Sequence, residues 1–103
     1  MSKILYATIM EEDDEIWVFN YYLTNCYHGA DFYIGVMVTS RSENKYYENS
    51  ISGIFPYKQD AERFIKYLCD NRASPISMPY LASEFIENNF LSAEVKAIDL
   101  SAN

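Results

Sequence analysis

The sequence contains few of the residues that mark metal centres, disulfide frameworks and membrane spans. Its 103 residues include two cysteines, one histidine, three glycines and three prolines. Two cysteines that lie far apart in the chain do not indicate a disulfide framework. A single histidine without a Cys-x-x-Cys pair leaves too few ligands for zinc, so we expect neither a metal nor a cofactor. The apolar run over residues 4–10 is too short for a signal peptide or a membrane span, and we expect a cytoplasmic protein with no membrane contact.

Basic residues are also scarce. Eight Lys and Arg stand against fifteen Asp and Glu, which gives a net charge of −7. A field of this sign repels phosphate backbones, so we expect no direct binding of nucleic acid. The charge suits a basic protein partner, although acidity of this size is also an ordinary route to solubility.

Aromatic and apolar residues are plentiful. Half of the residues are hydrophobic and 17% are aromatic, which is the profile of one ordered domain. In the first half they occur in four short runs, which predict strands over residues 3–10, 16–24, 31–40 and 45–55. The third run alternates most clearly, with Ile34, Val36 and Val38 on one face and Tyr33 and Met37 on the other. Short connections between the runs favour an antiparallel meander.

From Pro56 the apolar spacing changes to that of helices. A first helix is predicted to end at Asp70-Asn71, with an apolar face made of Tyr57, Ala61, Phe64, Ile65 and Leu68. Ser77 is expected to cap a second helix, whose apolar face holds Met78, Leu81, Ala82, Phe85, Ile86 and Phe90. The sheet provides the cover that both apolar faces need. We therefore predict a single α+β domain over residues 1–103. It consists of a four-stranded antiparallel meander sheet (1–55), two consecutive helices packed on one face (56–91), and a tail or edge strand (92–103).

Several segments resemble a known family. They are Tyr33-Ile34-Gly35-Val36, the charged helix from about Tyr57 to Asn71, Ser74-Pro75-Ile76-Ser77-Met78, and Glu84-Phe85-Ile86. Together they are similar to a family of short uncharacterised bacterial proteins, classed as a domain of unknown function, in which a strand pair is followed by two helices joined at Ser-Pro. The resemblance covers about residues 31–91 and leaves out the first thirty residues and the tail. It implies this architecture and a bacterial or phage origin, and it implies no activity and no site residues.

One segment brings a thiol, an imidazole and a carboxylate together: Cys26-Tyr27-His28-Gly29-Ala30-Asp31. These groups would serve a small hydrolase or thiol enzyme in which His28 activates Cys26. The two side chains share a face only if the chain is strand-like there. Loop polarity is the simpler explanation, so we expect a non-enzymatic protein without catalytic residues.

Five consecutive acids, Glu11, Glu12, Asp13, Asp14 and Glu15, follow the first strand. A calcium loop would need alternating oxygens and a central glycine, and both are missing. Mutual repulsion predicts an exposed, mobile turn. The acids would also suit an anionic rim that steers a basic partner. Alternatively, they imitate nucleic acid, as in a phage-type inhibitor of a basic nucleic-acid-binding protein such as a host defence effector.

Aromatic residues on the predicted sheet give the main indication of function. Trp17, Phe19 and Tyr21 fall on one face of the second strand, and Val18 and Tyr22 fall on the other. Two helices cover only one face, so the remaining face meets a partner or a second copy in a homodimer, unless the tyrosines are simply half-buried. We expect a small regulator or inhibitor that binds protein through an aromatic sheet face and an acidic rim. The expected partner-binding residues are Trp17, Phe19, Tyr21, Tyr33 and Tyr46, with Glu11, Glu12, Asp13, Asp14 and Glu15 steering the approach.

Overall fold

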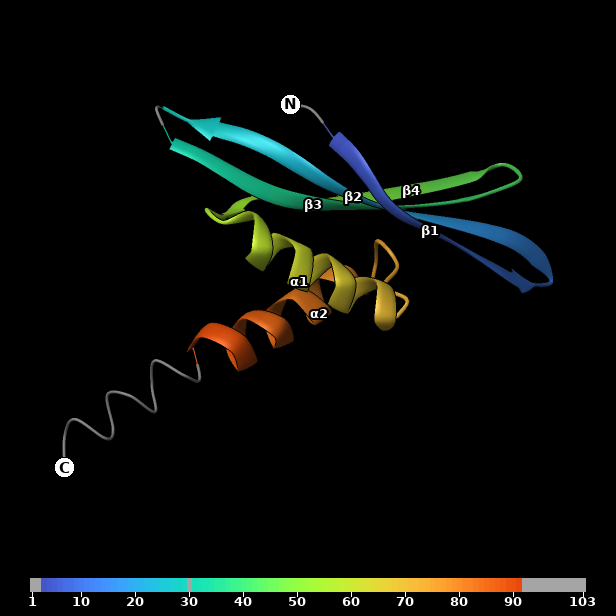
Figure 1. Cartoon of the computed structure of the whole chain (residues 1–103). Coiled ribbons are helices and arrows are strands. Elements are labelled where there is room, and N and C mark those ends of the chain that lie inside the picture. Colours follow the sequence, from blue (N-terminus) through green and yellow to red (C-terminus); the bar gives the residue numbers. More distant parts are fainter. Residues whose placement is uncertain (1–2, 30, 92–103) are drawn as a thin grey trace.

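Four strands and then two helices follow one another along the chain. The computed structural model describes residues 3–29 and 31–91. The strands are β1 (Lys3–Asp13), β2 (Glu15–His28), β3 (Asp31–Ser42) and β4 (Lys45–Phe55). They are followed by α1 (Lys58–Asp70), α2 (Met78–Ile86) and a π-helical turn, η1 (Glu87–Leu91). Neighbouring strands pair antiparallel in the order β1-β2-β3-β4 (Figure 1). The predicted α+β meander followed by two helices is therefore confirmed.

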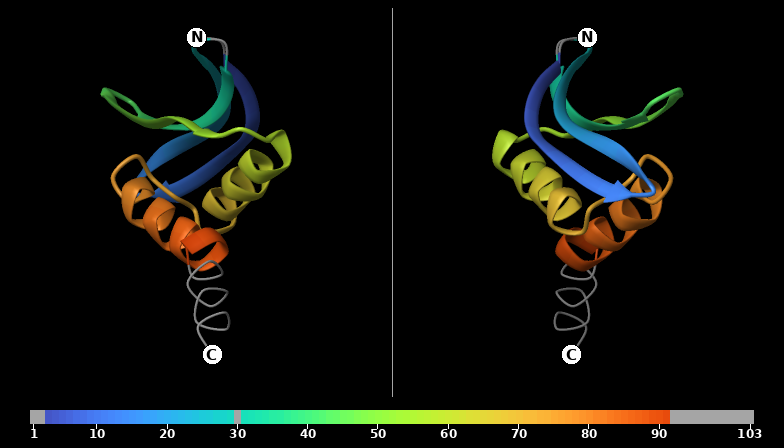
Figure 2. Two further views of the ribbon diagram at one scale, coloured as in Figure 1. Left: turned by 90° about the vertical axis from the view of Figure 1, so that its left-hand side faces the viewer. Right: turned by 90° about the vertical axis from the view of Figure 1, so that its right-hand side faces the viewer.

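The register of the strands decides which residues share a face of the sheet. Tyr21 of β2 lies opposite Ala7 of β1 and Val38 of β3, and Val38 lies opposite Asn49 of β4. Side chains alternate along each strand, so Tyr22 and its neighbours point the other way. Both helices lie on one side of the sheet in the two views of Figure 2. We call the side that carries Tyr21 the helix face and the other side the open face.

The core lies between the helices and the centre of the helix face. Its fully buried sheet residues include Tyr21, Val36 and Val38. The helices contribute their predicted apolar faces, with Ala61, Phe64, Ile65, Leu68, Met78, Ala82 and Phe85 buried. The ring of Phe64 stands 5.3 Å from that of Phe55 and 5.1 Å from that of Phe85, measured between centroids. Of the other predicted members, Tyr57 is exposed, Leu81 and Ile86 are partly buried, and the side chain of Phe90 lies outside what the structure describes.

The end of α1 is closed by a Schellman motif. The amide of Ala73 donates to the carbonyl of Leu68 at 2.9 Å, and the amide of Arg72 donates to the carbonyl of Cys69 at 3.0 Å. Arg72 has a φ of 50°, a conformation that normally favours glycine. The hydroxyl of Tyr21 donates to the carbonyl of Ala73 at 2.8 Å. This buried bond ties the end of α1 to the centre of the sheet.

Ser77 occupies the predicted N-cap position of α2, but its side chain makes no capping bond to the helix. The Ser77 amide donates to Oγ of Ser74 at 3.1 Å, and the Ser74 amide donates to Oγ of Ser77 at 2.9 Å. This reciprocal pair has the form of a capping box. Pro75 follows Ser74 in this turn, where a missing amide costs nothing. The hydroxyl of Ser77 is thus bonded to the turn that precedes α2 and not to the first turn of the helix.

The five acids form strand rather than the predicted turn. β1 continues through Asp13 and β2 begins at Glu15, so only Asp14 lies at the tip of the hairpin. Asp14 has a φ of 61°, a left-handed conformation that aspartate tolerates better than most residues. Alternation then places Glu11 and Asp13 on the helix face.

The strands are much longer than the helices that cover them. At about 1.5 Å per residue, the 13 residues of α1 span roughly 20 Å. At about 3.3 Å per residue, the 14 residues of β2 span roughly 45 Å. The β1–β2 and β3–β4 hairpins therefore extend past the helices at one end (Figure 1). Part of the helix face is left uncovered there.

β1 forms one edge of the sheet, and its residues 4–10 carry no charge. Ile4, Leu5, Tyr6 and Met10 are exposed on it. The register between β1 and β2 shifts between Leu5 and Ala7, so Tyr6 forms a bulge in the strand.

The expected tail or edge strand over residues 92–103 lies outside the described residues. Within residues 3–29 and 31–91, no helix combines the length and apolar character that crossing a membrane requires.

Candidate functional site

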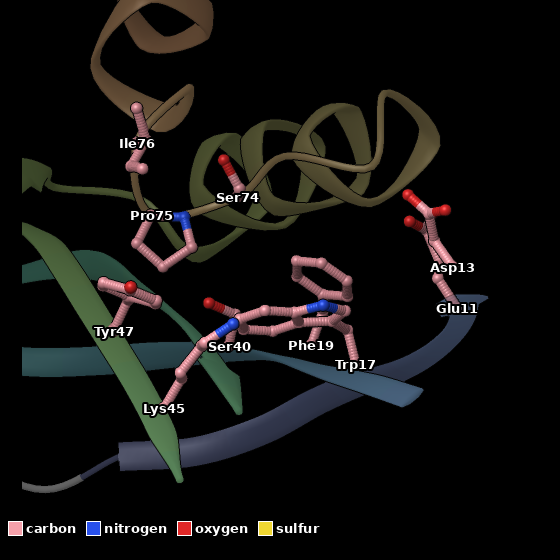
Figure 3. A pocket seen from close by; sticks show the side chains of 10 residues that line it. All are labelled: Glu11, Asp13, Trp17, Phe19, Ser40, Lys45, Tyr47, Ser74, Pro75 and Ile76. Atoms are coloured by element: carbon pink, nitrogen blue, oxygen red, sulfur yellow. The ribbon is translucent and has the colours of Figure 1, made fainter. Parts of the chain in front are cut away.

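A cleft lies on the helix face, where the two hairpins extend past the helices. Its volume is about 410 Å³. All four strands and the segment between α1 and α2 contribute to its lining, which consists of Glu11, Asp13, Trp17, Phe19, Ser40, Lys45, Tyr47, Ser74, Pro75 and Ile76 (Figure 3). We call it the aromatic cleft.

Two aromatic rings from different strands stack in this cleft. The rings of Trp17 and Tyr47 have centroids 6.2 Å apart and planes inclined by 27°. Ser40 of β3 lies between their strands, opposite Phe19 on one side and Tyr47 on the other. Because Ser40 is small and buried, the larger rings of β2 and β4 can approach each other above it. The result is a flat aromatic surface that a single strand does not offer.

The segment between the helices forms the opposite wall. Pro75 lies above the rings of Trp17 and Tyr47 in Figure 3, and Ile76 stands beyond it. The side-chain amide of Asn49 donates to the carbonyl of Pro75 at 3.1 Å, which fixes this wall to β4. Ile76 is 82% exposed. An aliphatic side chain is therefore presented to solvent at the wall of the cleft.

Carboxylates from the β1–β2 hairpin form the rim. Glu11 accepts from Arg72 at 2.9 Å, and Glu15 accepts from Lys45 at 2.9 Å. The bond from Lys45 lowers the pKa of Glu15, and the same bond raises the pKa of Lys45. Nζ of Lys45 also lies 5.7 Å from the centre of the Trp17 ring, within the range of a cation–π interaction. Asp13 has no ion pair within the described part of the chain.

The structure brings four of the predicted partner-binding residues into one site. Trp17, Phe19, Glu11 and Asp13 line the aromatic cleft, and Glu15 adjoins it through its ion pair with Lys45. Glu12 alternates with Glu11 and Asp13 and so belongs to the other side of the hairpin, and Asp14 lies at its tip.

The remaining three predicted residues lie elsewhere. Tyr33 and Tyr46 are on the open face, since each alternates with residues of the helix face. Tyr21 is a core residue and not part of an accessible surface, because its side chain is fully buried and its hydroxyl is bonded to Ala73. Alternation correctly places Tyr21 on the face of Trp17, but it does not report which face, or which end of a face, the helices cover.

Sequence reasoning missed Tyr47, Lys45 and the Ser74-Pro75-Ile76 wall. Period two along the fourth strand puts Tyr47 on the face that carries Phe55, which was a usable signal. No local pattern indicates that the segment after α1 folds back over Trp17, because that contact depends on the length of α1 and on the Schellman turn at Arg72.

The candidate thiol site cannot be built from the structure. Cys26 and His28 belong to β2, and their side chains lie outside what the structure describes. The other cysteine, Cys69 on α1, has a pKa raised by burial to about 11, which makes it a poor nucleophile at neutral pH. Among the described residues, no group of three His, Cys, Asp or Glu is placed to hold a metal ion.

The fold and the cleft together define a small α+β domain with a half-covered sheet. The chain belongs to a family of unknown function (DUF6514), whose model matches residues 1–88. The predicted resemblance to an uncharacterised family is thus confirmed, and the match includes the first thirty residues that the resemblance left out. A comparison with curated proteins found no match. A comparison with solved structures likewise found none.

Proposed function

We propose that this chain is a small protein-binding domain, acting as a regulator or inhibitor, and that the aromatic cleft binds a cationic segment of its partner. The observation that carries this proposal is the meeting of a stacked aromatic pair with an acidic rim at the uncovered end of the helix face. The proposal keeps Trp17, Phe19, Glu11 and Asp13 as partner-binding residues and adds Tyr47 and Pro75. It differs from the prediction in one respect, because these residues lie on the helix face and not on the face that the helices leave open.

The aromatic surface supports binding of a side chain rather than a role in folding alone. Trp17 is only partly buried and Tyr47 is 47% exposed, so both rings have area left to bury. Tryptophan and tyrosine are enriched among residues that dominate protein interfaces, because they bury a large area with little loss of entropy. A cleft of about 410 Å³ falls in the range that holds a few side chains.

The charges support a basic occupant. Glu12, Asp13 and Asp14 form no ion pair among the described residues, so the end of the hairpin presents three uncompensated carboxylates. Lys45 shows within the chain itself that an ammonium group is accommodated over the Trp17 ring when a carboxylate is beside it. An arginine or lysine of a partner would meet the same combination of ring and carboxylate at Asp13.

The same carboxylates support a nucleic-acid-mimicking inhibitor less well. Glu11 and Glu15 are each paired with a base. The five acids are also divided by strand alternation between two sides of the hairpin. They therefore do not present the single row of free charges that imitation of a phosphate backbone would need.

Selection from a random nonapeptide library, followed by titration of the chosen peptides, tests the proposal. Trp17 is the only tryptophan in the chain, so its fluorescence reports occupancy of the cleft directly. We expect the selected peptides to be enriched in Arg and Lys, to shift the emission of Trp17 in a saturable manner, and to bind more weakly as salt is added.

Two charge variants make the test specific. Asp13→Asn is expected to weaken binding by roughly tenfold, which is the loss of one charge-assisted hydrogen bond. Glu87→Gln removes the same charge from an exposed position beyond α2 and should leave the affinity unchanged. Peptides without an excess of Arg and Lys, or equal affinity for the wild type and Asp13→Asn, would overturn the proposal.

A further inference from the structure

A second hollow lies on the open face of the sheet, on the other side from the aromatic cleft. Its volume is about 380 Å³, and all four strands line it through residues that include Lys3, Asn20, Tyr22, Arg41 and Tyr46. We call it the basic pocket. Asn20 and Tyr22 alternate along β2 with Phe19 and Tyr21, so the same strand serves the cleft and core on one face and this pocket on the other.

The two basic residues of this pocket, Lys3 and Arg41, differ from the other basic residues that the structure describes in their lack of an ion pair. Every other lysine and arginine among residues 3–29 and 31–91 forms an ion pair with a carboxylate. No ion pair involves Lys3 or Arg41 within that part of the chain, although the protein carries a net charge of −7. Two unpaired cations therefore gather in one hollow of a strongly acidic protein.

Aromatic rings hold both cations against the wall of the pocket. Nζ of Lys3 lies 4.7 Å from the centre of the Tyr22 ring, and Cζ of Arg41 lies 5.1 Å from the centre of the Tyr46 ring. A cation–π contact uses the face of the ring and leaves the N–H groups of the cation available as donors.

Neighbouring polar groups, like the two cations, favour a negatively charged ligand. Oδ1 of Asn20 accepts from the hydroxyl of Thr8 at 2.7 Å, which leaves the amide nitrogen of Asn20 as a donor. Glu48 adds to the effect of burial in raising the pKa of Tyr46. Among the residues that the structure describes, the lining itself holds two cations and no carboxylate.

We propose that the basic pocket binds a small aromatic anion, a free molecule that carries a phosphate or carboxylate group beside a planar ring. Lys3 and Arg41 would hold the anionic group, since guanidinium and ammonium donors are the usual partners of phosphate and carboxylate. Tyr22 and Tyr46 would contact the ring. The pocket is separate from the proposed cleft, which takes a ligand of the opposite charge on the other face.

Three probes separate the contributions of charge and ring. Phenyl phosphate carries both, inorganic phosphate carries the charge alone, and phenol carries the ring alone. Each is titrated into ¹⁵N-labelled protein while the amide resonances are followed. We expect phenyl phosphate to bind at least about tenfold more tightly than either of the others. The shifted amides should include those of Asn20, Tyr22 and Arg41. The fluorescence of Trp17, on the opposite face, should not change.

Charge variants test the two cations. Arg41→Gln and Lys3→Gln are each expected to weaken the binding of phenyl phosphate by roughly tenfold. Arg41→Lys, which keeps the charge but loses the planar fork, should give an intermediate affinity. Lys58→Gln removes a charge from the exposed side of α1 and should leave the affinity within about twofold.

Each of the contrary results is decisive. Absence of saturable shifts with phenyl phosphate would overturn the proposal. Equal affinity for inorganic phosphate would show that the ring plays no part, and equal affinity for phenol would show that the charge plays none. Unchanged binding in a folded Arg41→Gln protein would remove the assigned role of Arg41. A response of Trp17 with no shift at Asn20 would place the ligand in the aromatic cleft instead.

Discussion

Trp17 and Tyr21 lie four residues apart on the same face of β2, and their surroundings differ completely. Tyr21 is fully buried beneath the helices, with its hydroxyl bonded to the carbonyl of Ala73. Trp17 is partly exposed and lines the aromatic cleft with Tyr47. The difference arises because a helix advances less than half as far per residue as a strand. The cover therefore ends between the two residues, and one continuous aromatic stripe becomes core at one end and surface at the other.

The largest expected effect comes from truncating the two residues in turn. Tyr21→Ala should lower the free energy of unfolding by about 3–5 kcal/mol, the usual cost of deleting a buried aromatic side chain. Trp17→Ala should lower it by about 1–2 kcal/mol, because less of the ring is buried. Denaturant unfolding measures both. Tyr80→Ala is the control, since Tyr80 is 66% exposed and its loss should change stability by less than about 0.5 kcal/mol. Equal losses for Trp17→Ala and Tyr21→Ala would contradict the distinction between core and cleft.

Removing only the hydroxyl of Tyr21 should have the next largest effect. Tyr21→Phe leaves the carbonyl of Ala73 buried without its partner, which costs about 1–3 kcal/mol. The ring itself is retained, so the loss should be clearly smaller than that of Tyr21→Ala. Urea titration of the two variants side by side gives the comparison. A Tyr21→Phe protein as stable as the wild type would mean that this bond does not hold α1 to the sheet.

Alkaline pH should lower the stability of the protein through two buried or partly buried groups at the covered end of the helix face. Burial raises the pKa of Tyr21 above its ordinary value, and burial also raises the pKa of Cys69 to about 11. The folded chain thus favours both neutral forms, and the resulting stability is complete below the pKa values of the unfolded chain, about 8.5 for cysteine and 10 for tyrosine. The contribution of Cys69 should be lost as the pH rises from about 9 through 11, and that of Tyr21 as the pH rises above about 10. In Tyr21→Phe, stability should fall less steeply with pH in this range. An unchanged slope would be evidence against the buried phenol.

Removing one hydroxyl from the wall of the cleft should have a smaller effect on stability. Ser74→Ala removes the hydroxyl that accepts from the Ser77 amide and should cost about 1 kcal/mol. Because Pro75 and Ile76 follow directly, the same variant should weaken peptide binding at the cleft. Ser83→Ala, at an exposed position of α2, is the matched control for stability and binding. A loss of stability without any loss of binding would show that the wall does not contact the ligand.

Arg72→Gly should give the smallest effect, because two contributions oppose each other. Glycine relieves the left-handed conformation of residue 72, which is worth about 1 kcal/mol. The same change removes the exposed ion pair with Glu11, which is worth about 0–1 kcal/mol. We expect stability to stay the same or rise slightly in thermal unfolding. A loss greater than about 1 kcal/mol would show that the pair with Glu11 holds the end of α1 to the rim.

Local patterns in the sequence predicted most of the fold. The alternation through Ile34, Val36 and Val38 identified the helix face of β3, and the spacing of Phe64, Ile65 and Leu68 identified the buried side of α1. Both succeed because side-chain direction follows directly from backbone period.

The errors occurred where a residue's role depends on a distant segment or on fine hydrogen bonding. Ser77 was placed correctly at the N-cap of α2, but its hydrogen bonds with Ser74 in the preceding turn were not predicted. Five adjacent carboxylates predicted a turn from repulsion alone. The strand pairing continued through them, aided by Lys45 from β4. The site was half predicted: the ring types and the acidic rim were visible in the sequence, but the point at which the helices stop covering the sheet was not.

The uncharged edge strand has a consequence for how the chain behaves in concentrated solution. Within residues 3–29 and 31–91, no strand pairs with the outer edge of β1, and its residues 4–10 carry exposed apolar side chains. This combination is the one from which strand-to-strand aggregation starts. The bulge at Tyr6 interrupts that edge, and the carboxylates from Glu11 onward bring like charges together whenever two such edges align in register. Replacing those acids to study the cleft therefore also removes a safeguard against precipitation.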